Sequence, residues 1–152
     1  MDLTELKTRL DEDEAAARAL CDGDWGDRPW AVEACSDKAS GECPCIVYQG
    51  EYKPFDEAQV PLIRYIADAE TPLIAAHIAR HDPARVLREV AVKRAIIAVH
   101  GPLLSTYGEP PTCSACWPYP KIGTHPLWPC STMRALAAVY SDHPGYRDEW
   151  KP

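Results

Sequence analysis

The chain has 152 residues, of which 46% are hydrophobic and 26% are charged, and its formal net charge is −7. A chain of this length and composition can bury a sizeable core, which excludes a wholly disordered protein and fits a single domain. The acidic residues gather in the first 60 positions, and this disfavours indiscriminate attraction to phosphate backbones.

The first segment, residues 1–21, predicts an amphipathic helix. Asp2 and Glu5 have the spacing of a capping box. The apolar residues that follow recur at helical intervals; they are Leu3, Leu6, Leu10, Ala17 and Leu20. We expect this stripe to pack on the protein's own core, and a narrow leucine seam that pairs with a partner helix is the alternative.

The second segment, residues 22–55, predicts a turn-rich loop that ends in a small β-hairpin. Strands are expected at 46–48 and 51–53, on either side of a Gln49-Gly50 turn. An isolated hairpin is only marginally stable, so we expect it to lean on the helices.

The third segment, residues 56–100, predicts a helical core. A first helix is expected to open at Asp56 and to include Ile66, because its apolar residues follow a helical spacing. A short second helix is predicted after Thr71-Pro72, since threonine can cap a helix and proline is favoured at its first position.

The longest predicted helix of this core uses the same device. Asp82 would cap it, Pro83 would occupy its first position, and its apolar stripe continues to Ile97. Glycine and proline then stop it directly after His100.

The last segment, residues 101–152, is proline-rich up to position 129 and then changes character. Ser131 is expected to cap a C-terminal helix that ends near Tyr140. The proline-rich part has few apolar residues of its own, so we expect a bound metal rather than a hydrophobic core to stabilise its fold.

Three cysteines in this segment have the spacing of metal ligands. Cys113 and Cys116 can offer both sulfurs to one metal from a turn, and Cys130 opens the last helix, where the helix dipole favours a thiolate. Tetrahedral zinc then needs a fourth ligand. His100 would tie the long helix to the last one, whereas His125 would complete a zinc-knuckle-like Cys-x2-Cys-x8-His-x4-Cys order.

The other cysteines are less informative. No signal-peptide pattern and no membrane-length apolar run is present, so we expect a cytoplasmic protein whose seven cysteines are metal ligands or reduced thiols. The remaining four could hold a second metal or an iron–sulfur cluster, but their spacing matches no established motif; they are Cys21, Cys35, Cys43 and Cys45.

The amino-acid sequence of several stretches is specific enough to identify a resemblance to a protein family. They are residues 77–90, the Cys113/Cys116 pair, residues 128–137 and residues 142–150. Together they resemble a family of short uncharacterised proteins, a domain of unknown function, from actinobacteria and their phages. The resemblance implies a histidine at the position of His100 and so favours His100 over His125 as the fourth ligand.

His77 and His81 form a second constellation, four residues apart on one predicted helix. Two histidines at this spacing hold zinc in one class of proteases, but Ile78 stands where such a protease places its glutamate base. We therefore favour histidines that pack at a helix junction. A metal-dependent enzyme that uses His77, His81 and Asp82 is the alternative.

Basic residues along the longest helix suggest a further alternative, a nucleic-acid-binding regulator. They are Arg85, Arg88, Lys93 and Arg94, and they would form the binding face. Such residues are more often a solvated surface.

The sequence thus predicts a mainly α-helical α+β protein with a small β-hairpin, in one domain stapled by a structural zinc. We expect a non-enzymatic protein-interaction or regulatory module whose partner is a protein, with no membrane attachment. The biological role, the partner's identity and the oligomeric state do not follow from the sequence.

Overall fold

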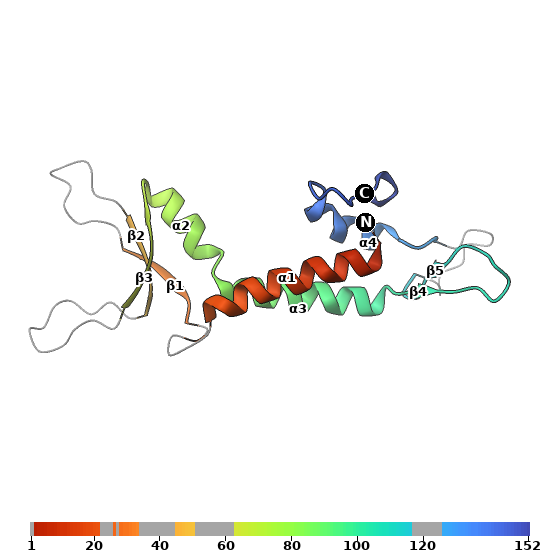
Figure 1. Cartoon of the computed structure of the whole chain (residues 1–152), viewed down its shortest axis with the longest axis horizontal. Helices are drawn as coiled ribbons and strands as arrows, with labels where there is room; N and C mark the ends of the chain where they lie inside the picture. The colour runs from red at the N-terminus through yellow and green to blue at the C-terminus, as the bar shows by residue number, and fades with distance from the viewer. Residues whose placement is uncertain (1, 22–25, 27, 34–44, 51–62, 117–125) are drawn as a thin grey trace, which may run out of the picture. The chain divides into compact units, whose positions relative to one another are not determined.

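The computed structural model describes residues 2–21, 26, 28–33, 45–50, 63–116 and 126–152 (Figure 1). The chain forms two compact units, of which one joins Met1–Glu12 to Glu89–Pro152 and the other is Asp13–Arg88. Helix α1, Leu3–Cys21, and helix α3, Pro83–Val99, contribute residues to both units. The single domain over the whole chain stays a prediction.

Helix α1 begins as the sequence predicts. The Asp2 carboxylate accepts a hydrogen bond from the Glu5 N–H at 2.9 Å, and the Glu5 carboxylate accepts one from the Asp2 N–H. This reciprocal pair is a capping box, which satisfies N–H groups that have no partner inside the helix. Leu6 and Leu10 are fully buried, so these two residues of the apolar stripe serve the protein's own core.

The unit Asp13–Arg88 contains an antiparallel sheet of three described strands. They are β1 (Trp30–Glu33), β2 (Cys45–Gly50) and β3 (Ile63–Ala69), with β2 in the centre. Along β2, Cys45, Val47 and Gln49 are buried and alternate with partly exposed residues, as expected for a strand with one covered face. The buried Gln49 amide donates a hydrogen bond to the Arg28 carbonyl at 2.9 Å.

Helix α2, Pro72–Arg80, packs against this sheet (Figure 1). Ala75 from the helix lies with Cys45, Val47 and Ala69 from the sheet in a small apolar core. The sheet therefore depends on α2 for its hydrophobic cover.

Two predicted elements in this region are wrong. Gln49 and Gly50 are not a turn, because they continue β2 and pair with Arg64 and Ile63 of β3. Gly50 does have the positive φ that a turn glycine would have, 117°, but it adopts this φ as the last residue of strand β2. The second predicted hairpin strand, 51–53, lies outside the described residues.

The helix predicted from Asp56 through Ile66 is also wrong over residues 63–66, the part of it that the structure describes. Residues Ile63–Ala69 form strand β3, while residues 56–62 lie outside the described part. The isoleucines at 63 and 66 fit a helical spacing, but pairing with β2 decides their conformation. Tertiary context overrides local pattern in this way most easily in short segments.

The two predicted helix starts after this strand are confirmed. The Thr71 hydroxyl accepts a hydrogen bond from the Ile74 N–H at 3.3 Å at the start of α2. The Asp82 carboxylate accepts one from the Arg85 N–H at 2.7 Å at the start of α3. Each cap is followed by proline, whose fixed φ suits the first helical position.

The unit that holds the C-terminal half contains, besides its parts of α1 and α3, five short elements that follow α3. They are β4 (Pro102–Leu103), β5 (Thr112–Cys113), α4 (Ser131–Ala137), η1 (Ala138–Tyr140) and η2 (Asp148–Trp150). Met133, Ala137 and Trp150 are buried in this unit. The cap of α4 is Cys130 and not the predicted Ser131, which is its first helical residue.

No helix in the described part of the chain combines the length and the apolar character that a membrane crossing requires.

Candidate metal centre

Three separate segments deliver the four side chains of the candidate site. His100 follows the last residue of α3, Cys113 ends β5, Cys116 lies in the turn after it, and Cys130 caps α4. The helix stop after His100 and the turn after Cys113 are local features of the sequence. Their convergence on one point is a property of the fold.

The four ligand atoms have the separations of a tetrahedral site. His100 Nδ1 lies 3.4 Å from Cys113 Sγ, 3.8 Å from Cys116 Sγ and 3.6 Å from Cys130 Sγ. Zinc bonds of about 2.3 Å to sulfur and about 2.0–2.1 Å to nitrogen at tetrahedral angles place sulfur and nitrogen about 3.6 Å apart. All four atoms lie within 4.8 Å of one another. The four side chains are therefore placed to share one metal ion.

The burial of the cluster suits a closed centre. Cys113 and Cys130 are buried, at 0% and 4% exposure, while His100 and Cys116 are partly exposed. Unpaired polar or charged groups are costly at such depth unless they are hydrogen-bonded or bound to a metal. The chemistry of the donor set therefore fits a metal ion.

Backbone hydrogen bonds fix the cysteine turn against the end of α3. The Ser114 N–H donates to the Gly101 carbonyl at 2.9 Å, and the Ser114 hydroxyl donates to the Val99 carbonyl at 2.7 Å. The Cys113 N–H donates to the Pro126 carbonyl at 3.2 Å. These bonds hold His100 and Cys113 in register, because their neighbours are tied directly to each other.

Trp128 supports the histidine from the other side. Its indole N–H donates to the His100 carbonyl at 3.0 Å. The Trp128 ring also packs edge to face against Trp150, with ring centroids 5.5 Å apart at an interplanar angle of 88°. These contacts hold the backbone that carries the ligand, and an apolar shell around a metal site limits solvent access.

The thiols of Cys116 and Cys130 have pKa values shifted in opposite directions. Burial raises the pKa of Cys116 to about 11, and the neighbouring Cys113 and Cys130 add to this shift. Burial also raises the pKa of Cys130, but the backbone N–H groups of Met133 and Thr132 and the Cys113 thiol outweigh it and lower the pKa below its usual value. A metal that binds here must therefore displace a proton from Cys116, which makes binding dependent on pH.

Other cysteines and the alternative histidine add no second centre within the described residues, where His100, Cys113, Cys116 and Cys130 form the only cluster found. Cys45 is buried in the core of the β-sheet, and Cys21 ends α1. The others singled out by the sequence lie outside the described residues; they are Cys35, Cys43 and His125.

His77 and His81 lie together on α2, with ring centroids 4.4 Å apart. His81 Nδ1 is 2.8 Å from the His77 carbonyl oxygen, so one ring nitrogen already has a partner. Asp82 is occupied as the cap of α3. No described third ligand joins the two rings, and the enzyme alternative gains no support from this geometry.

The basic residues of α3 make several internal contacts. Arg94 forms an ion pair with Asp11 at 2.5 Å, and the Lys93 ammonium lies 5.6 Å from the centre of the Tyr140 ring. The Arg85 guanidinium donates to the Arg80 carbonyl at 3.2 Å. Arg88 is exposed. A nucleic-acid face stays a prediction.

Sequence reasoning missed two side chains around the site, Trp128 as a support for His100 and Arg134. Arg134 lies one helical turn after Cys130, and its N–H donates to the Cys130 carbonyl at 2.9 Å. Proximity to Cys130 in the sequence was the only available signal for either residue.

The chain belongs to DUF6221, a family of unknown function, whose model matches residues 2–152. This confirms the resemblance to a domain of unknown function but does not establish a taxonomic origin. Neither the functionally curated proteins nor the solved structures gave a significant match to the chain.

Proposed function

We propose that the protein binds one zinc ion through His100, Cys113, Cys116 and Cys130, and that this zinc is structural. The observation that carries the proposal is the set of separations from His100 Nδ1 to the three sulfurs, 3.4, 3.8 and 3.6 Å. Thiolate and imidazole ligands in a tetrahedron favour zinc over the harder ions magnesium and calcium. Four protein ligands leave no open position for a substrate, which is the mark of a structural site.

Metal analysis tests this proposal directly. Protein purified without chelators should contain one zinc per chain, and cobalt substitution should give the visible absorption of a tetrahedral sulfur-ligated ion. Cys113→Ser should lose both signals, whereas Cys45→Ser, a change at a buried thiol of the sheet, should keep them. Absence of metal from a folded wild-type sample, with the fold unchanged in Cys113→Ser, would refute a structural metal.

The role we propose for the zinc-supported unit is a cytoplasmic protein-interaction or regulatory module. Its support is the segment between β4 and β5, which exposes two large apolar side chains, Leu104 at 82% and Tyr107 at 91%. Cys113 lies at the end of β5, so the metal would fix one base of this segment. Exposed apolar side chains held on a rigid base are typical of sites that contact other proteins.

A comparison of captured partners tests the interaction role. Tagged wild-type protein and a Leu104→Ser/Tyr107→Ser variant would be recovered from cells and their bound proteins quantified by mass spectrometry. A specific partner should be lost in the double variant and retained in Val139→Ser, which changes another exposed apolar residue, on η1. Partners that bind the double variant undiminished would place the interaction elsewhere.

A further inference from the structure

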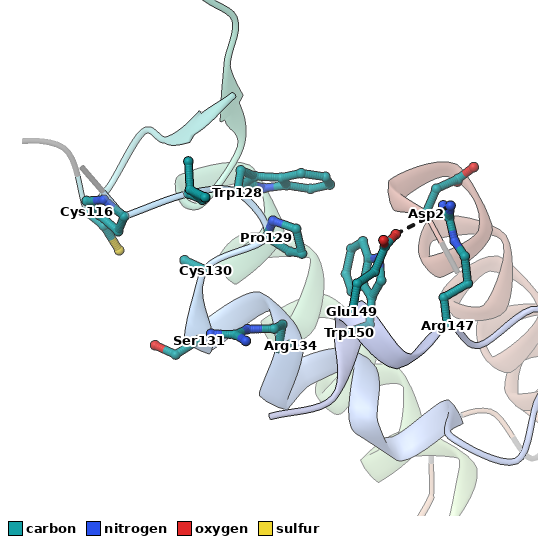
Figure 2. A pocket seen from close by; sticks show the side chains of 12 residues that line it. Asp2, Cys116, Trp128, Pro129, Cys130, Ser131, Arg134, Arg147, Glu149 and Trp150 are labelled. Atoms are coloured by element: carbon teal, nitrogen blue, oxygen red, sulfur yellow. Dashed lines mark ion pairs between the residues drawn. The ribbon is translucent and has the colours of Figure 1, made fainter. Parts of the chain in front are cut away.

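A pocket of about 730 Å³ opens beside the cysteine cluster, and Figure 2 shows the side chains that line it. Two of the proposed metal ligands, Cys116 and Cys130, form part of its wall, together with Trp128, Arg134 and Trp150. Sites for small molecules commonly have volumes of roughly 300–1,000 Å³ and combine apolar walls with a few polar anchors. The pocket has this composition.

Arg134 is the polar anchor that has no hydrogen-bond or ion-pair partner for its side chain among the described residues. Its side chain runs along α4 toward the end at Ser131 (Figure 2). The residue is partly buried, and its Nε is enclosed without a hydrogen-bond partner among the described residues. No described carboxylate forms an ion pair with it. Residues 117–125, which lie in the sequence between Cys116 and Pro126 of the wall, contain no Asp or Glu.

A guanidinium without a carboxylate partner among the described residues favours the binding of an anion. Arginine stays protonated at every accessible pH, and buried polar groups in folded proteins are nearly always paired. A planar guanidinium matches a carboxylate or a phosphate with two parallel hydrogen bonds. The pocket therefore favours a negatively charged group at Arg134.

The other charges of the pocket favour a single negative charge. Arg147 lies 3.4 Å from Glu149, so this second guanidinium already has a carboxylate (Figure 2). Asp2 is engaged as the cap of α1. A doubly charged phosphate would face these two carboxylates and the cysteine thiolates, whereas a carboxylate matches Arg134, the cation of the pocket lining that has no ion pair with a described residue.

The apolar part of the wall defines the rest of the ligand. The Trp128 ring lies in the wall with the buried Trp150 packed edge to face against it, and Leu127, at 59% exposure, extends this apolar surface. Aromatic surface of this kind packs well against a flat or branched apolar body.

We propose that this pocket binds a carboxylate attached to an apolar or aromatic body, with Arg134 as its anchor and Trp128, backed by the buried Trp150, as its wall. A small carboxylic acid and the C-terminal carboxylate of a peptide share this chemistry. The inference requires a folded metal centre but not a particular metal, so metal content is measured in every sample.

The experiment titrates probes into the zinc-loaded protein and follows the indole N–H signals of Trp128 and Trp150 by NMR, assigned with Trp128→Phe and Trp150→Phe. The probes are N-acetylphenylalanine, its neutral amide, 3-phenylpropionate and inorganic phosphate. We expect saturable shifts with the two carboxylates and at least tenfold weaker binding of the amide. Tighter binding of N-acetylphenylalanine than of 3-phenylpropionate would identify a peptide end as the ligand, and equal binding a small acid.

Variants tie the effect to Arg134. Arg134→Gln should weaken carboxylate binding by about 10- to 100-fold, the loss expected for a charge-assisted hydrogen bond. Arg134→Lys should restore part of it, and Arg18→Gln, which removes an exposed guanidinium on α1, should have no effect. Equal binding of acid and amide, preferential binding of phosphate, or no binding to protein with full metal content would each overturn the inference. In the last case Arg134 would serve only to balance the thiolate charge.

Discussion

Replacement of His100 by alanine should weaken zinc binding at the centre without unfolding the rest of the protein. The variant loses only the imidazole, because the hydrogen bond from the Trp128 indole is accepted by the backbone carbonyl of residue 100. Structural zinc binds zinc-finger peptides with about 10–16 kcal/mol. If four ligands share this energy evenly, the loss of one costs roughly 2.5–4 kcal/mol, or about 10²- to 10³-fold in zinc affinity.

Zinc competition with a chromophoric chelator measures this loss, and a thermal melt of the same samples measures its effect on stability. The matched control is His77→Ala, which removes an exposed histidine of α2. His125→Ala should also retain zinc and leave the melting temperature nearly unchanged. If His125→Ala released zinc and His100→Ala did not, the knuckle-like spacing would be the better guide and the geometry at His100 would be misread.

Further predictions concern the rest of the centre and the helix starts. Removal of zinc by a chelator should abolish amide hydrogen-exchange protection first within residues 100–140, whereas protection in strands β2 and β3 should outlast it; simultaneous loss in both would show one cooperative domain. Zinc affinity should rise with pH, because burial raises the pKa of Cys116 to about 11 and this thiol must lose its proton to bind, whereas the N–H groups near Cys130 lower the pKa of that thiol; zinc affinity that is independent of pH would contradict this. Asp82→Ala should destabilise the protein by about 0.5–2 kcal/mol in urea denaturation, since it removes a buried cap, and Ser131→Ala should have a much smaller effect because Cys130 occupies the cap position of α4; equal losses would disprove the assignment of caps.

The sequence predicted those features that depend on neighbouring residues. Thr71 and Asp82 cap helices because their side chains reach N–H groups three residues ahead, and this chemistry is complete within four positions. The pairing of Cys113 with Cys116 is local in the same sense. A helix stop directly after His100 was also readable from glycine and proline.

Features that depend on distant pairing were not readable. Residues Ile63–Ala69 form a strand because they pair with β2, and the sequence of the segment alone does not indicate this pairing. Gly50 was misread for the same reason. The wall around Arg134 combines residues near position 130 with Trp150, which only the folded chain brings together. The choice between His100 and His125 from spacing alone was open because two loop lengths were equally plausible.

The discontinuity of the unit that contains the metal centre affects the order in which the protein can fold during synthesis. Leu6 and Leu10 belong to a unit whose remaining residues begin at Glu89. At a synthesis rate of about 5–20 residues per second, these leucines wait roughly 4–17 s for the first of their partners. The sheet of the other unit is complete by then. The N-terminal helix must therefore stay soluble on the ribosome, and the run of acidic residues from Asp11 to Glu14 gives it the charge to do so.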